Sequence, residues 1–222
     1  MISVLIPTYN ERENVAQLAA ALDKALKAEH EILFIDDASP DGTAGEIRRM
    51  MAQNPTVRLV ERESKLGLTG AIRAGLDASR GEIVVVMDAD LSHPAEVVPL
   101  LIQRLEGSDI AIGTRQKVES WPAHRRIISA GADAIARVVL GVRASDPLSG
   151  FFAARRELLQ ATRFRTKGYK LLLNILADNP RASVAEVPYT FRDRHAGTTK
   201  LGAAEMLNYV FDIIRIKSPG WL

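Results

Sequence analysis

The sequence predicts an α/β protein built on a doubly wound, mostly parallel sheet, and two observations support that prediction. Short apolar runs rich in β-branched residues recur in the first half of the chain, at residues 2–6, 31–35 and 83–87. Such runs are typical of strands buried on both faces of a parallel sheet. Between them lie segments with apolar residues at helical spacing, and strands that alternate with helices build a parallel sheet with a helix layer on each face.

The individual elements follow from the same two patterns. The first helix is expected over residues 11–26, where Val15, Leu18, Leu22 and Leu26 share one face. Later elements are expected in strict alternation: helix 42–51, strand 57–60, helix 70–78, strand 83–87, helix 94–105 opened by Pro94, and strand 109–112. A further strand is expected over residues 185–191. With 222 residues and 47% hydrophobic content, the chain can bury a full core, so we expect one domain, residues 1–222.

Three predicted strands of the first half run into polar or acidic loops. The first strand is followed by residues 7–11 (PTYNE), the second by residues 36–43 (DDASPDGT), and the strand at 83–87 by Asp88, Ala89 and Asp90. Ligands of parallel sheets collect at the carboxyl ends of the strands. If the chain stays extended through residue 90, Asp88 and Asp90 project to the same side and can meet one hard cation. The three loops together predict a metal and nucleotide site.

Capping is the competing explanation for any single aspartate in these loops. Asp is a preferred residue at turns and helix N-caps, and Asp41 is expected to be such a cap. Three such loops at the ends of buried strands favour the functional interpretation of the set. A fourth segment, residues 67–70 (GLTG), lacks the spacing of known phosphate loops, so a plain helix-entry turn is favoured there.

Charge is unevenly distributed along the chain. Residues 1–110 carry 11 Lys and Arg against 18 Asp and Glu, and residues 111–222 carry 18 against 9. The basic second half suits a phosphate-bearing partner or an anionic membrane surface. Nucleic acid is disfavoured because aromatic residues are only 5% of the chain and do not interleave with the cations. No apolar stretch approaches the roughly 20 residues of a membrane span, so no crossing of a bilayer is expected.

Two basic segments of the second half each leave two interpretations open. Residues 121–140 combine Trp121 and three basic residues with an apolar helical stripe, which fits either a membrane-interface helix or a helix that covers a sheet edge. Residues 192–200 hold three cations, a glycine and two threonines, and could close on a phosphate. From that segment alone, a solvated charged loop is favoured.

At this level of detail the chain resembles a known family, the family 2 glycosyltransferases with the GT-A (Rossmann-like) fold. Within them it is similar to the dolichol (polyprenol) phosphate mannose synthases, which are dolichyl-phosphate β-D-mannosyltransferases. The resemblance runs nearly end to end, and its most specific part is the combination of DDASPDGT, DADLSHP and the basic FRDR…K segment. The motifs are IPTYNERENV (6–15), DDASPDGT (36–43), KLGLTGA (65–71), MDADLSHP (87–94), GTR (113–115), SDPLSGFFAARRELL (145–159), GYKLLLNIL (168–176), EVPYTFRDR (186–194) and GTTKL (197–201).

The resemblance implies roles for individual residues. The donor nucleotide would be held by Pro7, Tyr9, Glu11, Asp36, Asp37 and Asp88. The metal, Mg²⁺ or Mn²⁺, would be held by Asp88, Asp90 and, more weakly or through water, Ser92. The acceptor phosphate would be held by Arg115, Arg125, Ser129, Arg194 and Lys200. Asp90, Arg115, Arg194 and Lys200 would be the catalytic residues. Residues 1–113 would form the nucleotide-sugar and metal half, and residues 114–222 the acceptor and membrane-facing half.

Two positions depart from the family pattern. Asn174 stands where many members carry an acidic residue, and residues 197–200 (GTTK) replace the more usual GESK. The first departure removes a polar contact of the family, and the second leaves the cation in place.

The implied reaction is a metal-dependent, inverting transfer of mannose from GDP-mannose to a polyprenyl (dolichyl) phosphate. A phosphate oxygen is already anionic at neutral pH, so the attack does not need a general base. It needs positive charge that neutralises the leaving diphosphate and offsets the repulsion between the two anionic substrates. Asp146 lies where other family 2 enzymes place a base; a structural or acceptor-orienting role is favoured for it here. The enzyme would work peripherally at the cytoplasmic face of a membrane. Members of the family often continue into transmembrane segments, so such a segment, or a subunit that carries it, is a further expected partner.

Two other functions compete with this one. A polyprenyl-phosphate glucosyltransferase or related family 2 enzyme would use a UDP-sugar instead of GDP-mannose. A nucleotide-sugar binding protein would bind donor and metal without turnover.

Overall fold

The protein is described by a computed structural model that covers residues 1–64, 67–117, 141, 144–164 and 171–191. Its centre is a seven-stranded sheet with the order β3-β2-β1-β4-β6-β5-β7. The strands are β1 (Ile2–Thr8), β2 (His30–Asp36), β3 (Val57–Glu61), β4 (Ile83–Val86), β5 (Ile110–Lys117), β6 (Phe152–Arg155) and β7 (Val184–Thr190). The helices are α1 (Val15–Ala25), α2 (Thr43–Met51), α3 (Leu68–Ala78), the 3₁₀ helix η1 (Ala95–Val97), α4 (Val98–Arg104), α6 (Arg156–Ala161) and α7 (Leu171–Asp178). This architecture confirms the predicted α/β class.

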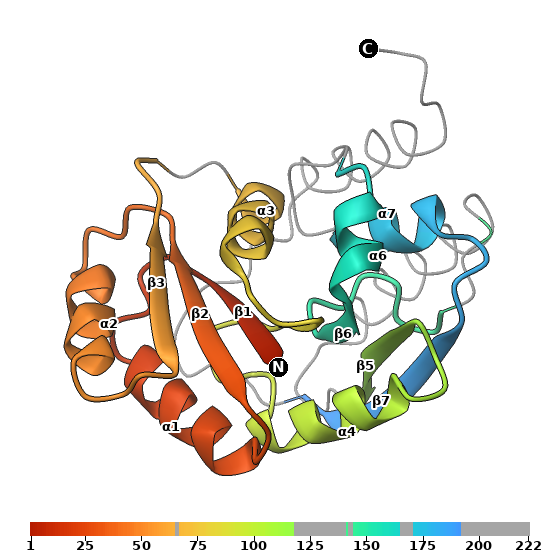
Figure 1. The fold of residues 1–222 in the computed structure, drawn as a ribbon, viewed down its shortest axis with the longest axis horizontal. Coiled ribbons are helices and arrows are strands. Elements are labelled where there is room, and N and C mark those ends of the chain that lie inside the picture. Colours follow the sequence, from red (N-terminus) through yellow and green to blue (C-terminus); the bar gives the residue numbers. More distant parts are fainter. Residues whose placement is uncertain (65–66, 118–140, 142–143, 165–170, 192–222) are drawn as a thin grey trace.

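Helices cover both faces of the sheet because the buried strands are apolar on both faces. Along β1, Val4 and Ile6 pack on the side that α1, α2 and α4 cover. Leu5 points the other way, into the core beneath α3, α6 and α7. Figure 1 shows these two helix layers on either side of the curved sheet. The alternation has the period of two that an extended strand imposes.

The topology places a switch point beside β1. From β1 the chain runs outward through β2 and β3, then returns across β1 to form β4 on its other side. Strands β1, β2, β3 and β4 pair in parallel. The crevice at the carboxyl ends of strands where the winding reverses is the common ligand position in such sheets. The loops after β1 and β4 flank this position.

One strand of the described sheet runs against the others. β6 pairs antiparallel with both β4 and β5, so β5 and its parallel partner β7 again point the same way as β4. The carboxyl ends of β5 and β7 therefore lie at the same edge as those of β1 and β4. Strand β6 is not predictable from the sequence, because a run of four residues (FAAR) is too short for a period to be recognised.

Two predicted helices differ from the structure in ways that the backbone explains. The helix predicted over residues 11–26 begins only at Val15, and the N–H groups of Glu11 and Arg12 before it donate to side chains of the loop after β2. The helix predicted over residues 94–105 is divided into η1 and α4. Pro99 lies in the first turn of α4, where its lack of an N–H prevents a continuous α-helical ladder from residue 95.

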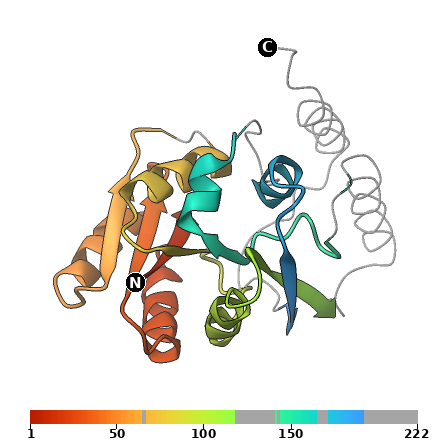
Figure 2. The same cartoon turned by 45° about the vertical axis from the view of Figure 1, so that its right-hand side comes forward.

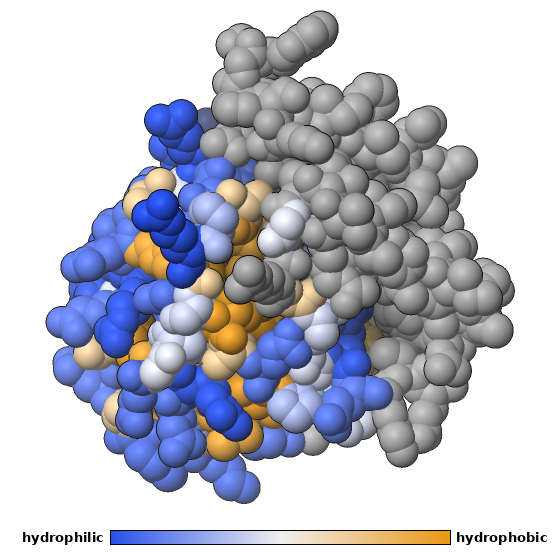
Figure 3. Space-filling view, turned by 90° about the vertical axis from the view of Figure 1, so that its right-hand side faces the viewer, coloured by the Kyte–Doolittle hydropathy of each residue, from blue (hydrophilic) through white to orange (hydrophobic). Residues whose placement is uncertain are grey.

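The surface turned toward the right-hand side of Figure 1 is mixed in character. Figure 3 shows hydrophobic residues gathered in the middle of its described part, with hydrophilic residues around them. Among the described residues, four large hydrophobic side chains are more than a third exposed: Met1, Tyr9, Met51 and Leu100. No helix in the part of the chain that the structure describes is both long and apolar enough to cross a membrane. The division of the chain at residues 113/114 stays a prediction.

A buried carboxylate, that of Glu31, connects neighbouring segments at the amino-terminal ends of the strands, opposite the switch point. Glu31 accepts hydrogen bonds from the Ser3 hydroxyl at 2.5 Å and from the N–H of Arg80 at 2.6 Å, and it forms an ion pair with Arg58. Burial alone would raise the pKa of Glu31, but these three partners together hold that pKa below its ordinary value. The Ser3 hydroxyl in turn accepts from the N–H of Gly81 at 2.8 Å.

The pH dependence of stability tests whether the ionised Glu31 carboxylate stabilises the fold. A carboxyl whose pKa is lower in the folded state stabilises the fold above its unfolded pKa, and that contribution is lost as pH falls through the folded value. Glu31→Gln should therefore lower Tm at pH 7, and the gap to the wild type should narrow as pH falls from about 5 toward 3. The control is Glu29→Gln, since Glu29 is exposed. A gap that stays constant with pH would contradict the assignment.

The close approach of β1 to the turn before β4 gives a second test. A Cβ on Gly81 would lie 2.6 Å from the backbone nitrogen of Ser3 and 2.8 Å from the carbonyl carbon of Ile2, and neither atom can move without shifting β1. Gly81→Ala should cost about 2 kcal/mol or more of unfolding free energy in a denaturant titration. Gly107→Ala is the matched control because a Cβ there meets nothing within 4 Å. Equal stabilities of the two variants would contradict the packing.

Candidate active site

The loops after β1 and β2 are fastened to each other. The backbone N–H of Asn10 donates to the Ser39 hydroxyl at 3.0 Å, and that of Glu11 donates to the Thr43 hydroxyl at 3.0 Å. Asp41 joins the two loops as well, because its carboxylate accepts from the N–H of Arg12 at 3.2 Å and from the N–H of Thr43 at 3.0 Å. Asp41 is not the helix N-cap that the sequence predicted: the N-cap of α2 is Gly42, and Asp41 precedes it and accepts from Thr43, the first residue of the helix. The two loops form one rigid wall of the crevice.

Each of the three predicted site loops contains one non-glycine residue in the left-handed backbone region. Asn10, Ala38 and Leu91 have φ values of 61°, 56° and 62°. These are the only positive-φ residues other than glycine among the described positions. Such conformations cost free energy and gather at functional sites, where the surrounding structure enforces them. Their presence in all three loops supports a functional interpretation of this edge of the sheet.

Asp88 and Asp90 follow β4 at the switch point. The side chain of Asp88 is 37% exposed, whereas Asp90 is buried. One oxygen of Asp90 accepts from the hydroxyl of Ser92 at 2.5 Å and from its N–H at 3.1 Å. Ser92 is thus placed to orient Asp90, and its predicted part as a metal ligand stays a prediction.

His93 was not among the predicted site residues, yet it holds Asp88 in place. Its Nδ1 accepts a hydrogen bond from the backbone N–H of Asp88 at 3.0 Å, so in the neutral ring Nε2 carries the proton. That Nε2 lies 3.8 Å from the Asp88 carboxylate. The ring stacks on Phe151 with 4.8 Å between ring centroids. The sequence contained this histidine within DADLSHP, but only the fold shows what it contacts.

The carboxylate pair fits a hard divalent cation. Both ligand groups are oxygens on residues two apart, and each is oriented by a neighbouring side chain, His93 for Asp88 and Ser92 for Asp90. Gly150 lies next to Asp88, since a Cβ on Gly150 would be in van der Waals contact with the carboxylate, at 3.5 Å. No group of three or more His, Cys, Asp or Glu among the described residues is arranged to hold a metal. A cation at Asp88 and Asp90 would complete its shell with oxygens of a bound diphosphate and water.

The residues predicted to bind the donor nucleotide lie on the wall made by the first two loops. Tyr9 is 38% exposed, and Glu11 accepts a hydrogen bond from the Asn14 amide at 2.7 Å. Asp36 accepts from the N–H and the hydroxyl of Ser39, at 2.9 and 2.6 Å. Pro7, the last residue but one of β1, is partly buried. The structure thus brings these residues to the same edge as Asp88.

Asp37 has a structural partner of its own. Its carboxylate pairs with Arg62, and its N–H donates to the carbonyl of Thr8 at 3.1 Å. Asp36 and Asp37 are both buried and both stabilise the loop after β2. Any contact of these two residues with a nucleotide would come in addition to those bonds.

Arg115, on β5, forms a two-pronged ion pair with Asp146. Arg115 Nε and Nη2 each donate to a different oxygen of Asp146, at 2.7 Å in both cases. Such a fork fixes the plane of the guanidinium and engages both carboxylate oxygens. The geometry therefore agrees with an orienting role for Asp146, as the sequence favoured.

Several predicted residues lie outside the described part of the chain. They are Arg125, Ser129, Arg194 and Lys200. The two basic segments, residues 121–140 and 192–200, lie outside it as well, so their alternative interpretations stay open. Asn174, in contrast, lies within the described part of the chain. It is buried in α7, and its side-chain amide donates to the carbonyl of Arg163 at 2.7 Å, so it fastens α7 to the segment after α6.

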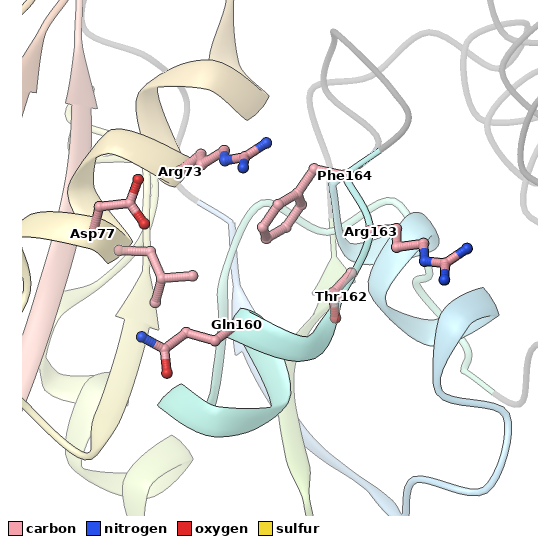
Figure 4. A pocket seen from close by; sticks show the side chains of 7 residues that line it. Arg73, Asp77, Gln160, Thr162, Arg163 and Phe164 are labelled. Carbon is pink, nitrogen blue, oxygen red and sulfur yellow. The ribbon is translucent and has the colours of Figure 1, made fainter. Parts of the chain in front are cut away.

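The described surface also carries a pocket of about 480 Å³ on the α3 side of the sheet (Figure 4). Helices α3 and α6 lie beside each other there in Figures 1 and 2. The lining residues are Arg73, Leu76, Asp77, Gln160, Thr162, Arg163 and Phe164. None of them is a predicted site residue, and the nearby GLTG segment begins α3 as an ordinary helix entry.

Comparison with known proteins identifies what this arrangement is similar to. The family model described as "Glycosyl transferase family 2" matches residues 3–163. A protein named dolichol-phosphate mannosyltransferase from Pyrococcus furiosus is 42% identical over 97% of this chain, and the match covers 63% of that protein. A protein of the same name from Saccharomyces cerevisiae is 34% identical over 94% of this chain and 84% of its own length.

Solved structures agree at the level of the fold. Glucosyl-3-phosphoglycerate synthase from Mycobacterium tuberculosis, in a complex with Mn²⁺, UDP-glucose and phosphoglyceric acid, matches with a TM-score of 0.75 at 25% identity. That match covers 99% of this chain and 79% of the other. The presence of Mn²⁺ in that structure supports the use of a divalent metal by this fold.

The role of His93 can be tested without an activity assay. His93→Phe retains a ring to stack on Phe151 but removes both nitrogens that face Asp88. Mn²⁺ binding, followed by the loss of the free-ion electron paramagnetic resonance signal, should weaken about tenfold or more. His30→Phe serves as the control, because His30 lies at the opposite end of the sheet, at the start of β2. Unchanged Mn²⁺ affinity in His93→Phe would rule out the orienting role.

Proposed function

This chain belongs to glycosyl transferase family 2, and on that basis we propose that it transfers mannose from GDP-mannose to a polyprenyl (dolichyl) phosphate. The observation that carries the proposal is the pair Asp88 and Asp90, held by His93 and Ser92 at the switch point of the sheet. A bound Mg²⁺ or Mn²⁺ would neutralise the diphosphate that leaves with the nucleotide. The names of the Pyrococcus and yeast relatives support mannose and the lipid phosphate as substrates.

The reaction follows from the charges of the groups. One oxygen of the acceptor phosphate attacks the anomeric carbon of the mannose, and the bond from that carbon to the donor diphosphate breaks. GDP leaves with the electron pair, and the configuration at the sugar inverts to a β-linkage. No proton has to be removed from the acceptor, because its phosphate is anionic at neutral pH.

In this scheme the arginine and lysine side chains would hold the anionic phosphate groups of the two substrates. Arg115, fixed by Asp146, lies at the same sheet edge as Asp88 and can hold an anionic phosphate near the metal. Arg125, Ser129, Arg194 and Lys200 complete the proposed phosphate contacts on the strength of their motifs. Asp146 needs no role as a base, since both of its oxygens are engaged by Arg115.

The place of action is part of the proposal. A polyprenyl phosphate is embedded in a membrane, so the enzyme would work as a peripheral protein at the cytoplasmic membrane surface. The excess of cations in residues 111–222 suits an anionic surface. A transmembrane segment, or a subunit that carries one, is a proposed partner.

A UDP-sugar donor is the second candidate, because the matching solved structure contains UDP-glucose. The deciding experiment measures release of nucleoside diphosphate from GDP-mannose and, in parallel, from UDP-glucose. Each donor is incubated with Mg²⁺ or Mn²⁺, with and without a short polyprenyl phosphate. Release of GDP that depends on the acceptor is the expected result. Release of UDP instead would move the enzyme to the glucosyl branch, and donor binding without release from either would indicate a binding protein.

The metal pair gives the sharpest substitution. Asp90→Asn keeps the size of the side chain and removes one negative charge from the proposed cation site. Transfer should fall by at least about 100-fold while the fold is retained. Asp77→Asn, on the exposed side of α3, is the control and should be active. Near-normal transfer by Asp90→Asn at low metal concentration would remove this carboxylate from the mechanism.

A further inference from the structure

Tyr189 presents an unexplained buried hydroxyl. The residue is 4% exposed, and its hydroxyl has no hydrogen-bond partner among the residues that the structure describes. Buried hydroxyl groups in proteins are nearly always hydrogen-bonded, so an unpaired one requires an explanation. A ligand absent from the free protein is one such explanation.

The position of Tyr189 points to the active site. Tyr189 is the register partner of Arg115, and the two residues lie side by side on the parallel strands β7 and β5. Partners in adjacent parallel strands direct their side chains to the same face of the sheet. The phenol and the guanidinium therefore point the same way at the carboxyl edge.

The ring of Tyr189 is fixed by the residues that also fix the metal loop. It packs edge-on against Phe151, with 5.5 Å between centroids, and against His93, with 5.9 Å. His93 in turn holds Asp88. The hydroxyl is thus carried by a rigid aromatic cluster that extends from β7 to the loop after β4.

The charges around the hydroxyl are those of the active site. Burial raises the pKa of Tyr189 well above its ordinary value, Arg115 lowers it, and Asp146, Asp88 and Asp90 raise it. The hydroxyl therefore lies within electrostatic reach of the guanidinium and of the metal pair. A raised pKa favours the protonated phenol at neutral pH, and in that form the hydroxyl can donate a hydrogen bond.

We propose that the Tyr189 hydroxyl donates a hydrogen bond to a phosphate oxygen of the substrate that lies between Arg115 and the Asp88–Asp90 pair. This inference rests on the proposed function, because that function brings phosphate groups to this space. Two sources supply the same chemistry: the diphosphate of the nucleotide sugar and the phosphate of the acceptor lipid. Tyr189 is then a binding and positioning residue for the transfer, and no bond is made to its oxygen.

The test is Tyr189→Phe, which removes the hydroxyl and keeps the ring that packs on His93 and Phe151. Thr190→Val is the matched control, since it removes a hydroxyl from the next residue of β7, whose side chain is exposed and points to the other face. Three quantities are measured for each variant: Tm without ligand, the Kd of Mn²⁺–GDP by calorimetry, and the kcat and KM of transfer for a short polyprenyl phosphate.

The expected result separates ligand binding from folding. Without ligand, Tyr189→Phe should match or exceed the wild type in Tm, because it removes an unpaired buried polar group. A weakening of about tenfold in the Kd of Mn²⁺–GDP would place the hydrogen bond on the donor diphosphate. A similar loss confined to KM or kcat for the lipid would place it on the acceptor. Thr190→Val should change none of the ligand parameters.

Two outcomes overturn the inference. Wild-type values for Kd, KM and kcat in Tyr189→Phe would show that the hydroxyl contacts no substrate. A clear drop in Tm without ligand would show that the hydroxyl already has a partner within the free protein. Failure of the proposed function is visible separately in the wild type, as turnover of a UDP-sugar in place of GDP-mannose. In that case the same comparison is made with Mn²⁺–UDP.

Discussion

The position of β1 between β2 and β4 is the constraint on which the site depends. Because all three strands run in parallel, their carboxyl ends meet at one edge, and the reversal of winding there leaves a crevice. The first two loops then bond to each other through Ser39, Asp41 and Thr43. That bonding imposes left-handed backbone on Asn10 and Ala38, and Leu91 repeats the feature after β4. The three loops proposed to hold the nucleotide and the metal thus share an unusual backbone geometry at one end of the sheet.

The second half of the chain is tied to this edge by an aromatic cluster. His93 from the loop after β4 stacks on Phe151 next to β6, and Tyr189 from β7 closes the cluster edge-on. The antiparallel insertion of β6 allows this, because it turns β5 and β7 so that Arg115 and Tyr189 arrive at the carboxyl edge. Packed aromatic rings therefore connect the loop that carries Asp88 and Asp90 with strand β7, whose Tyr189 is the register partner of Arg115.

The features that could be predicted from the sequence are those encoded by neighbouring residues in the chain. Apolar β-branched runs located β1, β2 and β4, and the polar loops predicted behind them do follow these strands, at the same end of the sheet. Properties that arise only from pairing across the sheet could not be predicted. The side chain of His93 reaches back five residues to Asp88, Arg115 meets Asp146 across 31 residues, and Tyr189 gains its role only from its register with Arg115. The short β6 and the delayed start of α1 likewise depend on contacts with distant residues.

The central claim is that a metal-bound diphosphate lies at the switch point between β1 and β4. The most direct test is anomalous diffraction from crystals grown with Mn²⁺ and GDP. The account predicts a manganese peak in contact with the carboxylates of Asp88 and Asp90, with the diphosphate on the side that faces Arg115. A manganese peak at other residues, or GDP bound away from the carboxyl ends of β1 and β4, would contradict it.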